Sequence, residues 1–367
     1  MKIVLVHDDF CQSGGAESLF ATIAQLFPKA PIFTSLVDWT KLPKSISQKR
    51  VKTSFIQKIP FSKILYKLLL PFYPLAFETF DFTKYDLVIS STTRFAKSVL
   101  TKPQTTHICY INSTPRFLWE EKAQNEYLPS LFISFFKPLL RWLKRWDLVS
   151  ASRVDFYIAN SKNVAARIKK YYGVDAKVIY PFANLDLFKP PQIHNWELKS
   201  QNYLLMVSRL VKWKKIETAI RAAQKTNKNL KIAGDGPDKT RLQKLASGSK
   251  NIEFLERVDT QTLINLYQNC QALVVTQEED FGIATVEAQA CGAPVIAYKR
   301  GGQSEIIKDG KTGILYKEQS VGSLQDAINR SSEVKWEISA CRRNALRFSK
   351  SQFTKSFKEF INVHAPK

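Results

Sequence analysis

The sequence of 367 residues lacks an apolar run long enough to cross a membrane. Its most hydrophobic stretch covers residues 68–77 and is interrupted by Pro71 and Pro74, whereas a spanning helix needs about 20 apolar residues. A secretory signal peptide is not expected either, because the apolar run at residues 3–6 is short and soon meets Asp8 and Asp9. We therefore expect neither a transmembrane helix nor export by a signal peptide.

Cysteine is sparse, and the sequence lacks the spacing of a structural zinc site. There is no Cys-x-x-Cys pair and no histidine at zinc-ligand distance from a cysteine. The cysteines are odd in number and widely scattered, at positions Cys11, Cys109, Cys270, Cys291 and Cys341. This usage predicts a reduced, cytoplasmic protein.

Internal repeats and low-complexity tracts are also missing. Hydrophobic residues make up 44% of the chain and charged residues 24%, which is typical of folded soluble proteins and excludes a collagenous or disordered one. At roughly 150 residues per domain, the length predicts about two domains.

Acidic residues are in the minority, with 32 Asp and Glu against 55 Lys and Arg, so the formal charge is +23. Such an excess favours anionic partners, namely nucleic acid, anionic lipid or a phosphorylated substrate. Residues 39–77 and 128–146 combine lysines, arginines and aromatic residues with no acid, which suggests contact with an anionic membrane surface. The alternative is that the aromatic residues pack helices onto a sheet while the lysines are solvated. No nucleic-acid-binding module accompanies the charge, so nucleic acid is not the expected partner.

Short β-branched runs alternate with amphipathic helical stretches, a pattern that predicts βαβ units and mostly parallel sheets. We expect an α/β protein of two Rossmann-like doubly wound domains facing a cleft, at residues 1–190 and 200–345, followed by a C-terminal helix within 346–367. A proline-broken linker is expected at residues 189–196. The expected strands are residues 3–6, 87–90, 108–111, 156–159 and 177–180 in the first domain and 203–207, 230–233, 252–255, 272–275 and 294–297 in the second.

The most informative segment, residues 278–297, follows an expected strand and opens a helix. Gly282 permits close approach of the backbone to a ligand. The amide groups of Ile283, Ala284 and Thr285 at the helix start are expected to be free, and together they form an anion site suited to a diphosphate.

Charged residues flank this helix start. Glu279 precedes the helix and Glu287 lies just over one turn inside it, so two carboxylates can hydrogen-bond hydroxyl groups on either side of a bound phosphate. Arg209 and Lys214 follow the first strand of the second domain and can neutralise a departing diphosphate. Taken singly, either glutamate is better explained as a solvent-exposed helix or cap residue, and the alternative for the cations is ordinary surface charge. The combination suits a sugar nucleotide.

Two glycine-containing turns are weaker candidates for ligand binding. Asp235 lies in a Gly-Asp-Gly-Pro turn at a strand end, where open α/β sheets bind ligands. Gly14 and Gly15 follow the opening strand, so their amide groups can meet a phosphate or an acceptor. Neither a Gly-x-Gly-x-x-Gly fingerprint nor a Walker loop is present, which argues against a nicotinamide-dependent dehydrogenase.

These residues resemble the family-4 retaining glycosyltransferases of the GT-B fold, especially the bacterial mannosyltransferase-like branch. The resemblance covers nearly the whole chain. Residues 279–287 resemble the family's Glu-x7-Glu motif, and Arg209 with Lys214 resembles its diphosphate-binding Arg/Lys pair. Supporting similarities lie at residues 14–17, 158–161, 234–237, 301–305 and 345–348.

The resemblance implies a role for each of these residues. Glu287 holds the ribose hydroxyls, Glu279 with the backbone of Phe281, Gly282 and Ile283 holds the donor sugar, and the base lies near Arg257 and Val258. The anomeric configuration is retained, no divalent metal or other cofactor is required, and the C-terminal helix crosses back to the first domain. The absence of an Asp-x-Asp motif after a strand agrees with metal independence.

Two positions depart from the family pattern. Asn112 stands where the family carries a histidine that contacts the donor sugar, in a segment that also holds Arg116 as a substrate-binding candidate. Asparagine can donate and accept hydrogen bonds but does not titrate; nearby His107 is expected to be structural. Glu256 stands where the family usually has glycine before the base-contacting residues.

We expect an enzyme that moves a hexose, mannose from GDP-mannose, to a lipid-linked or polysaccharide acceptor in cell-envelope glycan synthesis. It would act at the inner face of the cell membrane. Two alternatives are a non-catalytic relative that binds a nucleotide sugar or glycan, motivated by Asn112, and a GT-B sugar-nucleotide epimerase that consumes its substrate without an acceptor.

Overall fold

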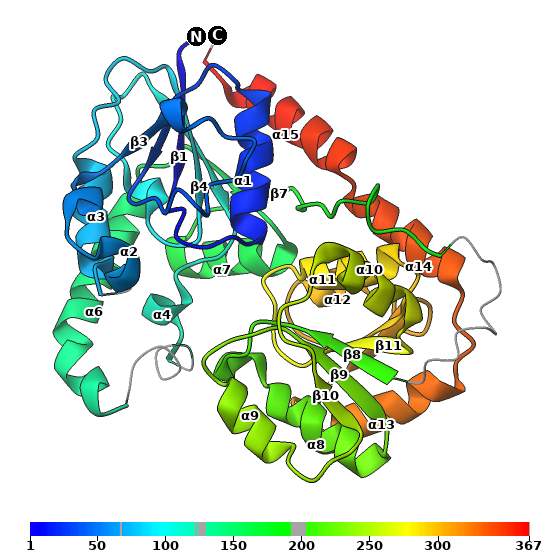
Figure 1. Cartoon of the computed structure of the whole chain (residues 1–367). Coiled ribbons are helices and arrows are strands. Elements are labelled where there is room, and N and C mark those ends of the chain that lie inside the picture. The colour runs from blue at the N-terminus through cyan, green and yellow to red at the C-terminus, as the bar shows by residue number, and fades with distance from the viewer. Residues whose placement is uncertain (67, 122, 124–129, 192–202, 367) are drawn as a thin grey trace. The chain divides into compact units, whose positions relative to one another are not determined.

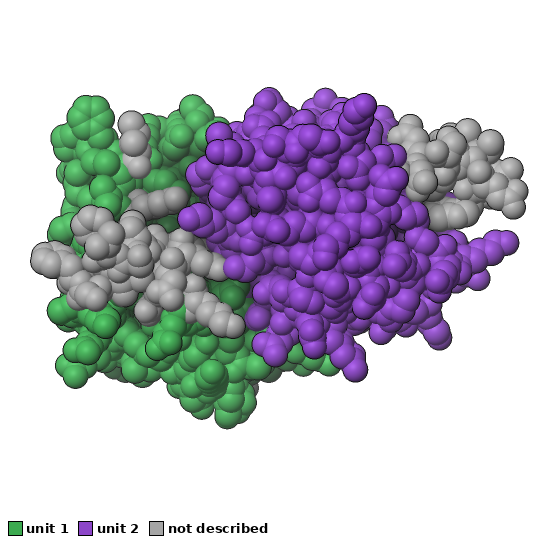
Figure 2. Space-filling view, turned by 90° about the horizontal axis from the view of Figure 1, so that it is seen from below, with its two compact units in different colours: residues 1–180, 355–367 green, residues 181–354 purple. Residues whose placement is uncertain are grey.

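A parallel sheet organises each half of the chain. The computed structural model describes residues 1–66, 68–121, 123, 130–191 and 203–366. It divides into one unit of Met1–Tyr180 with Lys355–Lys367 and a second of Pro181–Thr354 (Figures 1 and 2). Each unit is an α/β layer structure, so the prediction of two doubly wound domains is confirmed.

The first unit contains a seven-stranded sheet in the order β3-β2-β1-β4-β5-β6-β7, with parallel pairing throughout. The chain winds outward in both directions from β1 and β4, so the carboxyl ends of these two strands form the switch point where such sheets bind ligands. In register, Val4 lies opposite Val88 and Ile89 lies opposite Ile108. The strands are β1 Ile3–His7, β2 Ile32–Thr34, β3 Val51–Thr53, β4 Leu87–Thr92, β5 Thr106–Ile111, β6 Phe156–Ala159 and β7 Lys177–Val178.

Helices cover this sheet, and an aromatic core lies between them. Tyr73 and Phe77 of the short helix α3 are fully buried beside Phe82 and Phe95. Arg50 of η1 binds the carboxyl end of α1. Its guanidinium donates to the carbonyl of Phe27 at 2.8 Å and to that of Ala30 at 2.8 Å. The helices are α1 Gly15–Leu26, α2 Ser62–Leu65, α3 Tyr73–Glu78, α4 Arg116–Trp119, α6 Ser130–Ala151 and α7 Lys162–Tyr172, with 3-10 turns η1 Gln48–Arg50, η2 Phe55–Lys58, η3 Leu70–Phe72 and η4 Ala96–Ser98.

The second unit contains a six-stranded parallel sheet in the order β10-β9-β8-β11-β12-β13. Its switch point lies between β8 and β11, where Leu205 is opposite Leu273. Strand β13 was not predicted from the sequence. Its close pairing with β12 requires glycine, since a Cβ on Gly313 would lie 2.0 Å from the carbonyl oxygen of Val295. The strands are β8 Tyr203–Val207, β9 Asn229–Ala233, β10 Ile252–Phe254, β11 Ala272–Val275, β12 Val295–Tyr298 and β13 Gly313–Tyr316.

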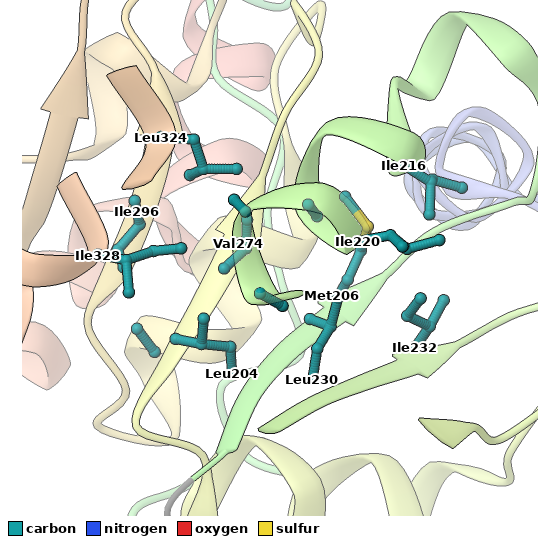
Figure 3. Packing of buried hydrophobic residues seen from close by; sticks show 14 of the residues in the cluster. Leu204, Met206, Ile216, Ile220, Leu230, Ile232, Val274, Ile296, Leu324 and Ile328 are labelled. Atoms are coloured by element: carbon teal, nitrogen blue, oxygen red, sulfur yellow. The ribbon is translucent and has the colours of Figure 1, made fainter. Parts of the chain in front are cut away.

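The core of the second unit forms where α8 and α13 pack on one face of the sheet. Figure 3 shows Ile220 of α8 and Ile328 of α13 directed toward Met206, Val274 and Ile296 on the strands. Burying each such side chain contributes about 1.5–3 kcal/mol. The helices are α8 Ile216–Thr226, α9 Lys239–Leu245, α10 Thr260–Asn269, α11 Ile283–Ala290, α12 Gln303–Ile306, α13 Val321–Glu333 and α14 Ile338–Ala345, with 3-10 turns η6 Lys212–Lys214 and η7 Leu346–Phe348.

The last helix, α15 Lys350–His364, contributes to both units. Phe353 contacts Phe182, while Phe357 contacts Tyr110 of β5. The expected linker falls partly on residues 192–202, which lie outside the described residues. Among the described helices, none combines the length and the apolar character that crossing a bilayer requires.

Candidate active site

The candidate site lies at the switch point of the second sheet. The chain leaves β8 toward Arg209 and η6, and it leaves β11 toward Glu279 and α11. Because β8 and β11 are neighbours, the two loops emerge side by side. The hydroxyl of Thr276 ties them together by donating to the carbonyl of Lys214 at 2.7 Å.

This arrangement joins Lys214 and Glu279, which are 65 residues apart in the sequence. The ammonium group of Lys214 lies 2.5 Å from Oε1 of Glu279, and the side chains are 12% and 23% exposed. Lys214 also lies over the ring of Trp213, with Nζ 4.1 Å from the centroid. The site therefore holds one cation and one carboxylate in direct contact and partly accessible to a ligand.

Arg209 is placed at the same edge but makes no ion pair with any described residue. It is exposed directly after β8, and its carbonyl accepts from the amide of Val211 at 3.0 Å. The structure thus joins Lys214 to Glu279 in an ion pair, whereas within the described residues Arg209 forms no ion pair with Glu279.

Glu287 lies on α11 and is half-buried. The hydroxyl of Tyr267, a fully buried residue of α10, donates to Oε2 of Glu287 at 3.2 Å. Burial raises the pKa of Glu287 to about 7, although the bond from Tyr267 acts to lower it. Near neutral pH this carboxyl group therefore exists in both protonated and ionised forms.

The start of α11 differs in one respect from the expectation. Gly282 has a φ of +100°, which places it in the left-handed region that favours glycine. The amide of Thr285 is not free, since it donates to the carbonyl of Gly282 at 3.0 Å. Only Ile283 and Ala284 keep the unpaired amide groups of a helix N-terminus. The bond from Thr285 to Gly282 therefore removes the amide of Thr285 from the three donors expected for a ligand.

Phe281 presents its backbone rather than its side chain. It is 4% exposed, and its ring packs edge-on against Phe348 with 5.4 Å between centroids. A ligand at the α11 start would thus meet the main chain of this residue.

The turns after β9 and β10 pack tightly at the same sheet edge. A Cβ on Gly234 would lie 1.9 Å from the carbonyl oxygen of Ser208. Asp235 is exposed, and its carbonyl accepts from the amide of Leu210 at 2.9 Å. The Asp235 turn and the loop after β8 therefore lie against each other.

The expected base-contacting residues follow β10. Arg257 is exposed and Val258 is half-buried. Glu256 has a φ of +42°, a conformation that costs about 1–2 kcal/mol for a residue with a Cβ. Its carbonyl accepts from the amide of Gly234 at 2.6 Å. The geometry explains why glycine suits this position.

In the first unit, Gly14 is the N-cap of α1 and Gly15 its first residue, at the carboxyl end of β1. Glu17 on the same helix is buried, and burial raises its pKa. A Cβ on Gly14 would lie 2.9 Å from Oε2 of Glu17, so glycine fits this tight approach.

The side chain of Asn112 is held at the end of β5. Its side-chain amide donates to the hydroxyl of Ser91 at 2.9 Å, and the backbone carbonyl of Asn112 accepts from the side-chain amide of Asn160 at 2.6 Å. Arg116 forms an ion pair with Glu120 at 2.9 Å. These candidates belong to a different unit from Lys214, Glu279 and Glu287.

His107 is buried within β5, where Nε2 lies 2.8 Å from the hydroxyl of Ser90. Burial lowers the pKa of His107 to about 3. A histidine that stays neutral inside the sheet agrees with the structural role expected for it.

Sequence analysis missed a polar cluster at the switch point of the first sheet. Asp8 accepts from the amides of Phe95 at 2.9 Å and Ala96 at 2.7 Å. Burial acts to raise the pKa of Asp8, but the nearby charge of Arg94 and the backbone donors leave it lowered. Asp9 forms an ion pair with Arg94. The signal was two acids directly after the first strand.

Two buried glutamines beside Glu279 were assigned no role from the sequence, although Gln303 lies within the family-like segment 301–305. Gln277 follows β11 and Gln303 begins α12, and both side chains bond to Glu279. In isolation a glutamine carries no recognisable signal, because only the fold shows that it faces a carboxylate. Within the described part of the chain, no group of three or more His, Cys, Asp or Glu side chains is arranged to hold a metal ion.

Comparisons with known proteins agree with this architecture. Residues 13–187 match the family model described as Glycosyltransferase Family 4, and residues 190–347 match the model described as Glycosyl transferases group 1. Each half of the chain therefore matches a glycosyltransferase family model, and the two parallel sheets form a GT-B fold.

Among sequence relatives, an uncharacterized glycosyltransferase of Methanocaldococcus jannaschii is 28% identical over 228 residues, which cover 58% of each chain. A D-inositol 3-phosphate glycosyltransferase of Mycobacterium tuberculosis is 28% identical over 211 residues, covering 53% of this chain and 44% of the relative. The matched region thus spans about half the length of these relatives.

Among solved structures, a sucrose-phosphate synthase from Thermosynechococcus elongatus is similar with a TM-score of 0.73 at 18% identity, covering 99% of both chains. The Anabaena protein HepE in complex with UDP-glucose gives 0.71 at 19% identity, covering 99% of this chain and 100% of the other. A lipopolysaccharide outer core galactosyltransferase gives 0.69 at 18% identity, covering 99% of both chains. These similarities establish the shared fold.

Proposed function

We propose that the chain is a retaining, metal-independent glycosyltransferase that takes a hexose from a nucleoside diphosphate sugar. The observation that carries the proposal is the contact between Lys214 and Glu279 at the sheet edge where α11 begins. One site then offers a cation for a diphosphate, a carboxylate for sugar hydroxyls and, on α11, Glu287 for a ribose.

In this mechanism the bond from the anomeric carbon to the diphosphate breaks while the acceptor oxygen bonds to the same face of that carbon. The acceptor proton passes to the departing phosphate oxygen, so no protein nucleophile is required. Lys214 stabilises the charge that develops on the diphosphate, and exposed Arg209 supplies a second cation. The amides of Ile283 and Ala284 add donors at the helix start.

The donor we propose is GDP-mannose, with a lipid-linked or polysaccharide acceptor in cell-envelope glycan synthesis. The resemblance to the mannosyltransferase-like branch supports this donor. A UDP-hexose is the competing donor, because the structurally similar HepE has been solved with UDP-glucose. The base-contacting region at Arg257 and Val258 would distinguish guanine from uracil.

We also propose that the first unit touches an anionic membrane surface. Apolar side chains between η2 and the end of α3 are exposed by 74% at Phe61, 73% at Leu68 and 54% at Leu75. Lys58 and Lys63 are exposed nearby, and no acid occurs among residues 39–77. Exposed apolar groups with cationic neighbours suit the interface of an anionic bilayer.

The competing explanation holds for other residues of the same stretches. Tyr73 and Phe77 are fully buried in the core, and Lys67 lies outside the described residues. In α6, Leu143 is buried while Trp142 is 50% exposed. The aromatic residues thus divide between core packing and the surface proposed for lipid.

A non-catalytic relative that binds nucleotide sugar is the second candidate. Asn112 supports it, because the side chain at this position is bonded to Ser91 within the sheet and cannot supply a titrating group. Turnover of a sugar nucleotide separates the two candidates.

The test is calorimetric titration with GDP, UDP and ADP, then with the matching sugar nucleotides, followed by a hydrolysis assay with and without EDTA. Binding of one nucleotide and slow hydrolysis of its sugar form, unaffected by EDTA, support the proposal. Binding without turnover favours the second candidate, and no binding refutes both.

Variants assign the site. Glu279→Ala and Lys214→Ala should each reduce transfer strongly, because each removes one member of the contact pair. Lys169→Ala is the matched control, since it also removes a lysine from an ion pair, here with Asp175 at 2.9 Å on the surface. Near-normal rates in both site variants would overturn the assignment.

A further inference from the structure

Gln303 is a fully buried glutamine at the first position of α12, and its side chain bonds to the site loops and to β12. Its Oε1 accepts from the amide of Glu279 at 3.0 Å. Its Nε2 donates to the carbonyls of Gln277 at 2.7 Å and Tyr298 at 3.1 Å. These three bonds fix the orientation of the Gln303 side chain. They also tie together the backbone of Gln277 and the backbone of Glu279.

Gln277 acts on the carboxylate itself. Its side-chain amide donates to Oε1 of Glu279, the same oxygen that pairs with Lys214. The other oxygen, Oε2, makes no hydrogen bond or ion pair with any described residue. With the side chain 23% exposed, the carboxylate is held by one oxygen and offers the second to a ligand.

The backbone of Glu279 is fixed by the same segment that carries Gln303. Its carbonyl accepts from the amide of Gly302 at 2.8 Å, while its own amide is taken by Gln303. Gly301 has a φ of +85°, and a Cβ there would lie 2.3 Å from the carbonyl oxygen of Glu279. Both main-chain polar groups of Glu279 are thus satisfied by residues 301–303.

We propose that Gln303 and Gln277 are positioning residues that hold Glu279 with Oε2 presented to the hydroxyl groups of the donor sugar. This inference rests on the proposed function and deepens it. Such a carboxylate must be held to within about 0.5 Å of its productive place. The nucleotide part of the donor is assigned to Lys214, Glu287 and the start of α11, so loss of the glutamines should affect the sugar more than the nucleotide.

The experiment compares Gln303→Met with the wild-type protein, because methionine keeps the length of the side chain and removes its hydrogen bonds. We expect kcat for transfer or hydrolysis of the sugar nucleotide to fall about 10- to 100-fold, the cost of a displaced catalytic group. The affinity for the free nucleoside diphosphate, measured by calorimetry, should stay within about twofold. A displaced Glu279 leaves the contacts between the protein and the nucleotide intact.

Gln289→Met is the matched control. Gln289 is also a fully buried glutamine of this unit, and its amide donates to the carbonyl of Thr312 at 3.2 Å and to its hydroxyl at 3.1 Å. Its substitution removes a similar set of buried bonds that do not reach Glu279. It should leave kcat and nucleotide affinity near the wild-type values even where it lowers thermal stability.

A double-mutant comparison identifies the route of the effect. If Gln303 acts through Glu279, adding Gln303→Met to Glu279→Ala should produce little further loss of rate. An undiminished loss in that background, or a wild-type rate for the single variant, would overturn the inference. Should Gln303→Met fail to fold, Gln277→Met removes the bond to Oε1 and is expected to give the same split between rate and affinity. A wild-type protein that consumes no sugar nucleotide would instead refute the proposed function, and this inference with it.

Discussion

The pH dependence of stability offers a direct test of the environment assigned to Glu287. Burial raises its pKa from 4.5 to about 7, so between these values the folded protein binds a proton that the unfolded chain has released. The free energy of unfolding should therefore fall as the pH rises through this window. Each pH unit contributes about 1.4 kcal/mol, and the full window amounts to at most about 3.4 kcal/mol.

The assay is urea unfolding of the wild-type protein and Glu287→Gln at pH 5 and pH 8. Glutamine removes the titrating group, so the variant should gain stability relative to wild type at pH 8 by up to about 3 kcal/mol compared with its relative stability at pH 5. Glu333→Gln, at an exposed position on α13, is the control. Parallel pH profiles for wild type and Glu287→Gln would refute the reasoning.

The same group predicts how nucleotide affinity varies. A ribose diol donates to a carboxylate, so binding should favour the ionised form of Glu287 and strengthen as the pH rises from 6 to 8. The affinity of Glu287→Gln should lack that component. Calorimetric titration of the nucleoside diphosphate across this range, with wild type and variant in parallel, isolates the contribution of Glu287 from the titration of the ligand itself.

Two further predictions concern the first unit. Lys97→Met should lower the free energy of unfolding by about 3–5 kcal/mol, because it leaves the buried carboxylate of Asp147 without the cation that pairs with it. A loss below about 1 kcal/mol in urea unfolding would contradict this. Replacing Lys58 and Lys63 with glutamine should weaken binding to vesicles of anionic lipid and reduce its salt dependence, whereas unchanged sedimentation with the vesicles would show that both lysines are only solvated.

The repeated strand and helix pattern was enough to predict the central strands, because strands buried on both faces are nearly continuous apolar runs. β1, β4 and β11 were placed to within two residues. The sequence did not reveal β2 and β3, which have three residues each. Strands this short exist because the neighbouring strand offers hydrogen bonds, and that is information about tertiary structure.

Candidate site residues were predictable where the sequence contains a glycine at a helix start or a charged side chain. Gly282 and the acids around it mark the start of α11 as a candidate ligand site, and the fold joins Glu279 to Lys214. The amide of Thr285 was wrongly expected to be free, since the bond that occupies it depends on how tightly the turn closes. Gln303 lay in the family-like segment 301–305, but no role could be assigned to it or to Gln277, because that role follows from the three-dimensional contact with Glu279.

Glu256 departs from the family pattern, and the conformational cost of this departure can be measured as a change in the free energy of unfolding. Its φ of +42° costs about 1–2 kcal/mol with a side chain present, while glycine in its place costs up to about 1 kcal/mol through the entropy of the unfolded chain. The exposed pair with Lys239 contributes at most about 1 kcal/mol. Glu256→Gly should therefore change the free energy of unfolding little.

The control for this prediction is Glu253→Gly in β10, where the backbone is extended and carries no strain to relieve. Glycine there should cost about 1 kcal/mol, so the two variants should differ even though each replaces a partly exposed glutamate that pairs with a lysine. Urea unfolding of both measures the difference. Equal losses would mean that residue 256 pays no conformational cost, and that the glycine usual at this position in the family serves ligand approach and not backbone geometry.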